Sequence, residues 1–150
     1  MPILTKLKQG QSIGEEEIIL ILQLRERFIS EIEENKLRYV KEIKYLDGEI
    51  QQLDKIRFQT TEAVAIKKKE EELRDGYKKS LALVCEMESL INHVWFHYQQ
   101  LPYDLKMALE ILYVSRKGWK FICDELHIGK KRAIEYRNKA IEEIVEKLNA

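Results

Sequence analysis

The chain has 150 residues, of which 35% are charged and 45% apolar, with only six Gly and two Pro. This composition is typical of long or coiled helices, and it excludes a β-sandwich or an α/β sheet, which would need far more turn residues. The formal net charge is zero, so no overall field draws the protein onto nucleic acid or membrane.

The first long helix is expected to follow a loose segment, residues 1–12, that contains Pro2 and Gly10 and has no helical periodicity. Ser12 and Glu15 fit a capping box, which predicts a helix start near residue 13. From there, apolar residues recur in alternating steps of four and three, the 3.5-residue period of a coiled-coil seam. The eleven seam positions, nine of them apolar, are Ile18, Leu22, Arg25, Ile29, Ile32, Lys36, Tyr39, Ile43, Leu46, Ile50 and Leu53.

Two charged residues, Arg25 and Lys36, occupy positions of this seam. Polar seam residues can fix the register or the oligomeric state of a coiled coil. Alternatively, their aliphatic stems pack in the seam while the charges reach water. The sequence leaves both interpretations open.

A second long helix is predicted after residues 58–61, FQTT, because two adjacent threonines suit a turn with a new helix cap. It runs to about Gln100, and its seam is clearest after Gly76. The seam residues are Tyr77, Leu81, Val84, Met87, Ile91, Val94 and Tyr98. We expect the two helices to form an antiparallel hairpin, or coiled coil, over residues 13–101 that serves oligomerisation.

Pro102 marks the predicted end of the hairpin, since proline disfavours helical geometry in the residue before it. The rest of the chain, residues 102–150, has a different pattern, in which short helices are separated by tight, basic turns. The expected helices cover residues 103–114, 119–126 and 130–148, with turns at 115–118 and 127–129.

The last two of these helices, separated by a turn of three residues, have the spacing of a helix-turn-helix. Ala133 is the small residue that lets the second helix cross close to the first. If Ala133, Tyr136 and Ala140 point inward, the polar residues of the first turns must point outward. These outward residues are Lys130, Lys131, Arg132, Glu135, Asn138 and Lys139.

Positive charge is concentrated on this motif. Residues 114–140 contain eight Lys or Arg against three Asp or Glu, a net +5, so the rest of the chain carries −5. Such segregation is what phosphate binding requires. Arg132 and Asn138 could form bidentate contacts with base edges, lysines suit phosphates, and Glu135 either accepts from a cytosine amino group or stays solvated. Three further cations could hold the DNA backbone, namely Arg116, Lys117 and Lys120.

Residues 101–144 resemble the region-4 helix-turn-helix of sigma-70 factors, in the form carried by phage late-gene transcriptional activators of the RinA and ArpU type. The matching features are Trp119, which opens the first helix, the run ICDELHI, and the spacing of Ala133 and Ala140. The usual Ser before the recognition helix is replaced by Gly129, a serviceable N-cap. The resemblance implies sequence-specific binding to a promoter, with host RNA polymerase as a partner, in the cytoplasm of a bacterial host.

Other motifs favour structural roles. His93 and His97 stand four apart, a spacing that can bind a metal, but they lack a third ligand and are interpreted as core histidines. The aromatic residues 95, 96 and 98 are expected to seal the hairpin against the C-terminal helices, with base stacking as the alternative. His127 suits packing or a phosphate contact. No arrangement of nucleophile, base or phosphate loop is evident, so we expect neither an enzyme nor a cofactor.

Compartment is predicted from the cysteines and from hydropathy. Cys85 and Cys123 are interpreted as reduced apolar side chains, with a disulfide as the alternative. A secretory signal is not evident, and the longest apolar run, residues 18–22, is too short to cross a bilayer. We therefore expect a soluble intracellular protein.

Two other functions are compatible with a helix-turn-helix joined to long helices. A small terminase subunit combines these parts in a ring, although there the DNA-binding unit usually precedes the oligomerising helices. A coiled-coil adaptor would use the C-terminal domain to bind protein instead of DNA. The regulator, which we favour, is expected to act on double-stranded DNA as a homo-oligomer, most simply a dimer.

Overall fold

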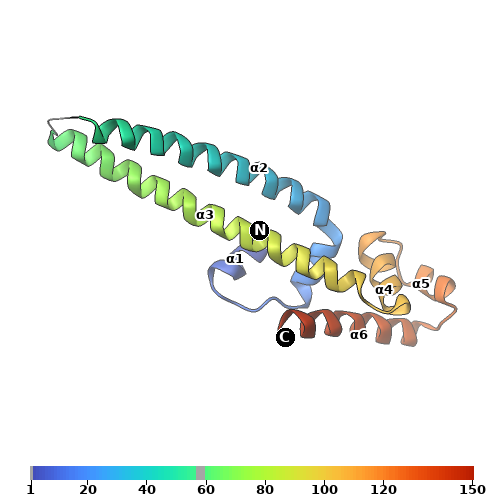
Figure 1. Ribbon diagram of the computed structural model, residues 1–150. Helices are drawn as coiled ribbons and strands as arrows, with labels where there is room; N and C mark the ends of the chain where they lie inside the picture. Colours follow the sequence, from blue (N-terminus) through green and yellow to red (C-terminus); the bar gives the residue numbers. More distant parts are fainter. Residues whose placement is uncertain (1, 57–59) are drawn as a thin grey trace. The chain divides into compact units, whose positions relative to one another are not determined.

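The computed structural model describes residues 2–56 and 60–150, and every regular element in these two ranges is helical. The prediction of an all-α fold, with a long helix pair followed by shorter helices, is confirmed (Figure 1). Within the same ranges, no helix combines the length and the apolarity needed to cross a bilayer. The elements are α1 (Pro2–Lys8), α2 (Glu15–Asp54), α3 (Thr61–Gln99), α4 (Tyr103–Leu109), the π-helical turn η1 (Glu110–Val114), α5 (Trp119–Leu126) and α6 (Lys130–Leu148).

The long helices pair within one chain. Over residues 29–86, α2 and α3 run antiparallel and form a compact unit (Figure 1). All positions of both predicted seams are buried or half-buried, so the 3.5-residue period correctly identified the packed faces. An antiparallel pair in which each helix covers the apolar face of the other is the expected result of two such seams joined by a short connection.

Polar contacts between the two helices fix the register of this pairing. Lys67 forms an ion pair with Asp54, and Arg74 donates to Asp47 at 3.2 Å. At the start of α3, the Thr60 hydroxyl oxygen accepts from the Ala63 N–H at 3.0 Å, which confirms a threonine cap at this point. The remainder of the predicted turn, residues 58 and 59, lies outside the described residues.

A kink at Leu24, with φ −123° and ψ 19°, interrupts α2. Residues 1–28 and 87–150 form the second compact unit, so the base of the helix pair belongs with the C-terminal helices. The sequence placed the division at Pro102 because the seam continues through the kink. Periodicity reports that a helix face is covered, but it does not report which element covers it.

The segment expected to be loose contains α1, and this expectation is therefore wrong for Pro2–Lys8. Ile3 is fully buried, and Lys6 forms an ion pair with the buried Glu17 of α2. A helix of seven residues is too short to show periodicity or to be stable alone. Tertiary contacts that leave no local signal in the sequence therefore hold α1 in place.

The helix cap of α2 lies two residues later than the predicted capping box. The helix begins at Glu15, and the Glu17 carboxylate accepts from the Gly14 N–H at 2.9 Å. This is the backward half of a capping box, in which a Glu in the first turn satisfies the N–H of the residue before the helix. Ser12 lies outside the helix, so the predicted pairing of Ser12 with Glu15 is incorrect.

Glu17 caps α2, forms an ion pair with Lys6 and is buried. Burial alone would raise the pKa of Glu17, but hydrogen bonds from Lys6 and from the backbone of Glu17 and Gly14 outweigh it and hold the pKa below its ordinary value of 4.5. We expect Glu17→Gln to lower the free energy of unfolding by about 2 kcal/mol, because a hydrogen-bonded charge is lost from a buried site. Urea denaturation at neutral pH measures this change, with Glu16→Gln in the same turn as control.

The pH dependence of this loss has a definite sign. Because folding lowers the pKa of Glu17, its carboxylate stabilises the fold above the unfolded value of about 4.5, and that contribution disappears as the pH falls through the folded value. The difference in stability between the parent and Glu17→Gln should therefore shrink below about pH 4.5. A difference that stayed constant under acid conditions would contradict the assigned role.

Candidate nucleic-acid interface

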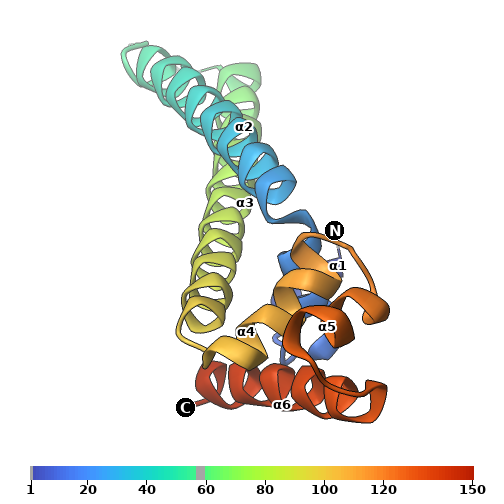
Figure 2. The same ribbon diagram turned by 90° about the vertical axis from the view of Figure 1, so that its right-hand side faces the viewer.

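The C-terminal helices share a small apolar core. Ile111, Ile122 and Ala133 are buried at its centre, one each from η1, α5 and α6. The partly buried residues packed around them are Met107, Leu112, Trp119, Cys123, Leu126 and Ile128. Figure 2 shows α5 and α6 joined by a tight turn, with α4 beside α6. This core determines the angle at which α6 presents its outer face.

The predicted helix over residues 103–114 is divided in the structure. α4 ends at Leu109, and Glu110–Val114 form a π-helical turn in which the Ser115 N–H donates to the Glu110 carbonyl at 2.7 Å. Positive φ angles at Arg116 (54°) and Gly118 (88°) then redirect the chain into α5. A single π-turn shifts side chains by a fraction of a turn, so a short periodic pattern cannot reveal it.

The turn of the helix-turn-helix lies where the sequence predicts it. His127 adopts the left-handed conformation, with φ 55° and ψ 46°, and the Ile128 N–H donates to the Cys123 carbonyl at 3.1 Å. This is the αL geometry that commonly ends helices. The His127 side chain is exposed, so it does not pack in the core, and its predicted phosphate contact stays a prediction.

The small residue of the second helix is where the motif requires it. Ala133 and Ala140 have no exposed surface, and Ile141 and Ile144 continue the same inner face of α6. Tyr136, which was expected to point inward, is half-buried, and so is its neighbour Arg137. The close crossing of α5 and α6 at Ala133 is therefore confirmed.

All nine candidate DNA-binding residues are exposed. Lys130, Lys131 and Arg132 form the first turn of α6, and none of their side chains makes a hydrogen bond or ion pair with another residue in 2–56 or 60–150. Gly129 caps the helix without a side-chain hydrogen bond. Amide groups at a helix start, three cations and the positive end of the helix dipole together make a surface suited to phosphate.

The positive surface covers only the first turns of α6. Beyond Lys139, three outward and flanking positions are acidic, namely Glu142, Glu143 and Glu146, and the last turn carries one cation, Lys147. This change of sign along one helix separates a basic N-terminal part from an acidic C-terminal part. A helix that enters a groove by its first turns requires positive charge only there.

Two cations before the motif are engaged within the chain. Arg116 donates to the Gln23 carbonyl at 3.2 Å, next to the kink of α2. The Lys117 ammonium lies 4.5 Å from the centre of the Phe121 ring. Lys120 carries no such contact in the part of the chain that the structure describes. Of these three candidates, Lys120 is therefore the most available to a phosphate.

Arg137 organises a contact that sequence reasoning did not find. Its guanidinium donates to the Tyr113 hydroxyl at 2.8 Å and to the Asn138 side-chain oxygen at 2.9 Å, and it pairs with Glu15 of α2. Burial lowers the pKa of Arg137, but Tyr113 and Glu15 outweigh burial and raise it. Glu15 lies near the opposite end of the chain, so no local pattern could indicate this link.

The Arg137 contact affects the predicted role of Asn138. Because the Asn138 oxygen already accepts from Arg137, the amide nitrogen is the part of this side chain that remains to donate. A bidentate contact with adenine needs both groups, so Asn138 must first release Arg137. Arg132 carries no such restriction and is the better candidate for reading a base.

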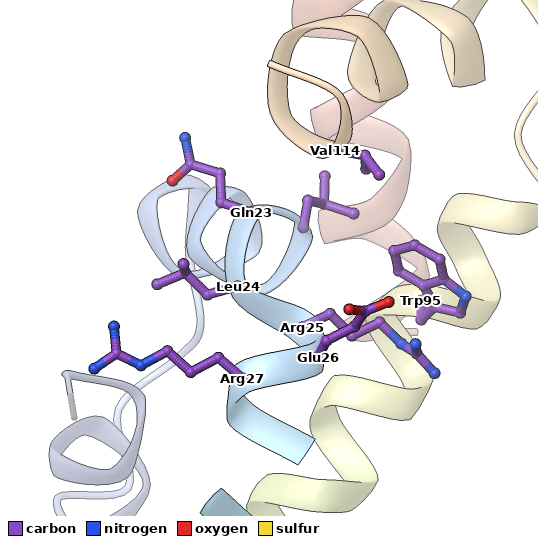
Figure 3. Close-up of a pocket in the computed structure, with 8 residues that line it drawn as sticks. Gln23, Leu24, Arg25, Glu26, Arg27, Trp95 and Val114 are labelled. Carbon is purple, nitrogen blue, oxygen red and sulfur yellow. The ribbon is translucent and has the colours of Figure 1, made fainter. Parts of the chain in front are cut away.

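A pocket of about 400 Å³ lies at the kink of α2 (Figure 3). The Arg25 guanidinium is 4.5 Å from the centre of the Trp95 ring, while Arg27 extends to the other side of the helix. Arg25 Nε is buried, and no described residue accepts a hydrogen bond from it. The charge of this seam residue is therefore placed against an aromatic ring.

The aromatic cluster before Pro102 is only partly buried. The rings of Trp95 and Tyr98 lie 4.9 Å apart, whereas the Phe96 side chain is 56% exposed and does not share this packing. Burial, with a smaller effect from Glu110, raises the pKa of Tyr98 to about 12. Among the described residues, no group of three His, Cys, Asp or Glu side chains is placed to hold a metal.

Comparisons with protein family models, with curated proteins and with solved structures find no match to this chain. A helix-turn-helix by itself does not define a function, because function depends on the groups grafted on a fold. The function must therefore be inferred from the exposed cations of α6 and their geometry.

Proposed function

We propose that this protein is a sequence-specific DNA-binding transcriptional regulator. The observation that carries the proposal is the first turn of α6, where Lys130, Lys131 and Arg132 are exposed and have no partner among the described residues. Three unpaired cations at the start of the second helix of a helix-turn-helix match the position that enters the major groove. In a chain with zero net charge, this local concentration is the feature that DNA binding best explains.

Individual roles follow from side-chain chemistry. Arg132 reads a guanine through paired contacts to O6 and N7, and Lys130 and Lys131 neutralise phosphates. Lys120 and Lys139 extend the phosphate contacts on either side, and Glu135 faces the groove as a possible acceptor for a cytosine amino group. The remaining candidates, Arg116, Lys117 and Asn138, contribute after they release the contacts described above.

The resemblance to RinA- and ArpU-type activators supports promoter binding with host RNA polymerase as partner, in the cytoplasm of a bacterial host. In this proposal the protein acts as a dimer that reads two half-sites about one helical turn, roughly 34 Å, apart. The second helix-turn-helix of a dimer doubles the number of base contacts. The sequence preference of two half-sites together is therefore much stronger than that of one.

The test is selection from a pool of random duplexes, followed by sequencing, at about 50 mM and about 200 mM salt. An enriched motif that persists at the higher salt would support specific readout by α6. Weak binding that disappears with salt and enriches nothing would contradict the proposal and favour an adaptor that binds protein. A mass corresponding to a ring of about eight or more subunits would instead favour a terminase-like packaging role.

A further inference from the structure

The unit formed by residues 29–86 leaves many of its large apolar side chains exposed to solvent. Among its described residues, the buried apolar side chains are Ile32, Leu46, Ile50 and Val84. Its large exposed apolar side chains are Leu37, Val40, Tyr45, Ile56, Val64, Ile66 and Leu73. Two helices acquire most of their stability from the apolar faces they bury, and units of this size are marginal. This unit therefore has apolar surface that a further helix layer could cover.

One part of that surface forms a shallow, open groove on α3. Ile66 and Leu73 are 50% and 52% exposed and, seven residues apart, lie on the same helix face. They line a hollow of about 550 Å³ together with Lys69, Glu70 and Glu72. These five residues are called the α3 groove below.

Glu70 supplies an independent observation in the α3 groove. Its Oε2 is buried and accepts no hydrogen bond from the described part of the chain. Because this oxygen has no exposed surface, only the rest of the half-buried Glu70 carboxylate is open to a donor from a partner. The partner that fits this groove carries both an apolar side chain and a cation.

A second copy of the α3 groove supplies both an apolar side chain and a cation, at the spacing that a two-fold contact needs. A two-fold axis between residues 69 and 70 would place two α3 helices antiparallel, with Ile66 of one chain against Leu73 of the other. The same axis sets Lys69 of each chain opposite Glu70 of the second chain. An isologous dimer contact needs a surface that is complementary to itself, and this spacing satisfies the condition.

We propose that the α3 groove is the docking site of a second copy of this chain, with Lys69 of each copy donating to Glu70 of the other. Residues 29–86 contain 12 Lys or Arg and 13 Asp or Glu, so two such units do not repel each other through net charge.

The contact gives the proposed regulator a surface for its dimer, but its evidence is independent of DNA binding. The test is sedimentation of the full chain without DNA, from about 1 μM to about 200 μM. The unmodified chain should show a concentration-dependent dimer. Leu73→Glu should weaken the dimer by about tenfold or more, since it places a charge in the centre of an apolar contact. Leu37→Glu, at a position 59% exposed on α2, is the matched control and should leave it unchanged.

A charge exchange tests the register. Lys69→Glu and Glu70→Lys should each weaken the dimer by about fivefold, because each sets like charges opposite one another. The double variant restores the pair with reversed sign and should return the dissociation constant to within about twofold of the parent. Circular dichroism on each variant verifies that the helices are retained.

Three results would overturn the proposal: a monomer throughout the concentration range, a dimer insensitive to Leu73→Glu, or a double variant as weak as the singles. Failure to enrich a DNA motif while the dimer behaves as described would contradict only the proposed function. Motif enrichment by a chain that remains monomeric would contradict the docking site and the dimeric part of the proposed function, but not DNA binding by α6.

Discussion

Replacing Arg132 with alanine should remove most of the preference for one DNA sequence while leaving binding to unrelated duplexes nearly intact. The side chain is exposed on the first turn of α6 and has no partner within residues 2–56 and 60–150. A bidentate arginine–guanine contact accounts for about 1–3 kcal/mol of discrimination, so the ratio of specific to nonspecific affinity should fall by roughly tenfold to a hundredfold. Titration of a selected site and of a scrambled duplex measures that ratio.

Lys130→Ala and Lys131→Ala should behave differently from Arg132→Ala. Each lysine neutralises a phosphate in the proposed complex, so each substitution should weaken binding to all duplexes and reduce the slope of log affinity against log salt by about one. Lys147→Ala, which removes the same charge from the last turn of α6, is the control and should change neither quantity. If all these variants bound every duplex as the parent does, α6 would not be the recognition helix.

Ala133→Leu should separate α5 from α6. Ala133 has no exposed surface and packs in the core with Ile111 and Ile122, so three added carbon atoms must displace neighbouring side chains or the helix itself. Overpacking of this kind costs about 1–3 kcal/mol. We expect a loss of about that size in the free energy of unfolding, measured with urea, and a loss of DNA binding because α6 no longer holds its angle.

Ile134→Leu is the matched control for this substitution. Ile134 is the next residue of α6 and is partly exposed, so a change of shape at constant volume should cost less than about 0.5 kcal/mol. Ala133→Leu with parental stability and parental DNA binding would mean that the two helices do not pack closely at this position.

Local signals were enough to predict much of the fold. The 3.5-residue period located the packed faces of both long helices, and Pro102 marked the end of α3. The three-residue turn and Ala133 together identified the α5–α6 crossing. These features are local because a helix buries every third or fourth residue, and turn residues act on their own backbone. The exposure of the six candidate site residues on α6 follows from the same periodicity.

Contacts between distant parts of the chain decided the rest. The short helix α1 is held in place by the buried Ile3 and by the ion pair of Lys6 with Glu17. The start of α2 is fixed by the same Glu17, whose carboxylate also accepts from the Gly14 N–H. Arg116, which is predicted to contact DNA, donates to a carbonyl at the kink of α2, a contact that no local pattern indicates. A positive side chain is equally suited to phosphate, carboxylate or carbonyl oxygen, so sequence alone cannot tell which acceptor it meets.

The orientation of α6 is the feature that depends most clearly on contacts between distant parts of the chain. Arg137 joins it to Tyr113 in the π-turn and to Glu15 at the start of α2, three positions that no sequence period relates. Periodicity determines which face of each helix is covered, because burial repeats with the helical turn. Which helices meet, and at what angle, depends on side-chain volumes and polar pairs across the contact, and these become definite only when the chain is folded.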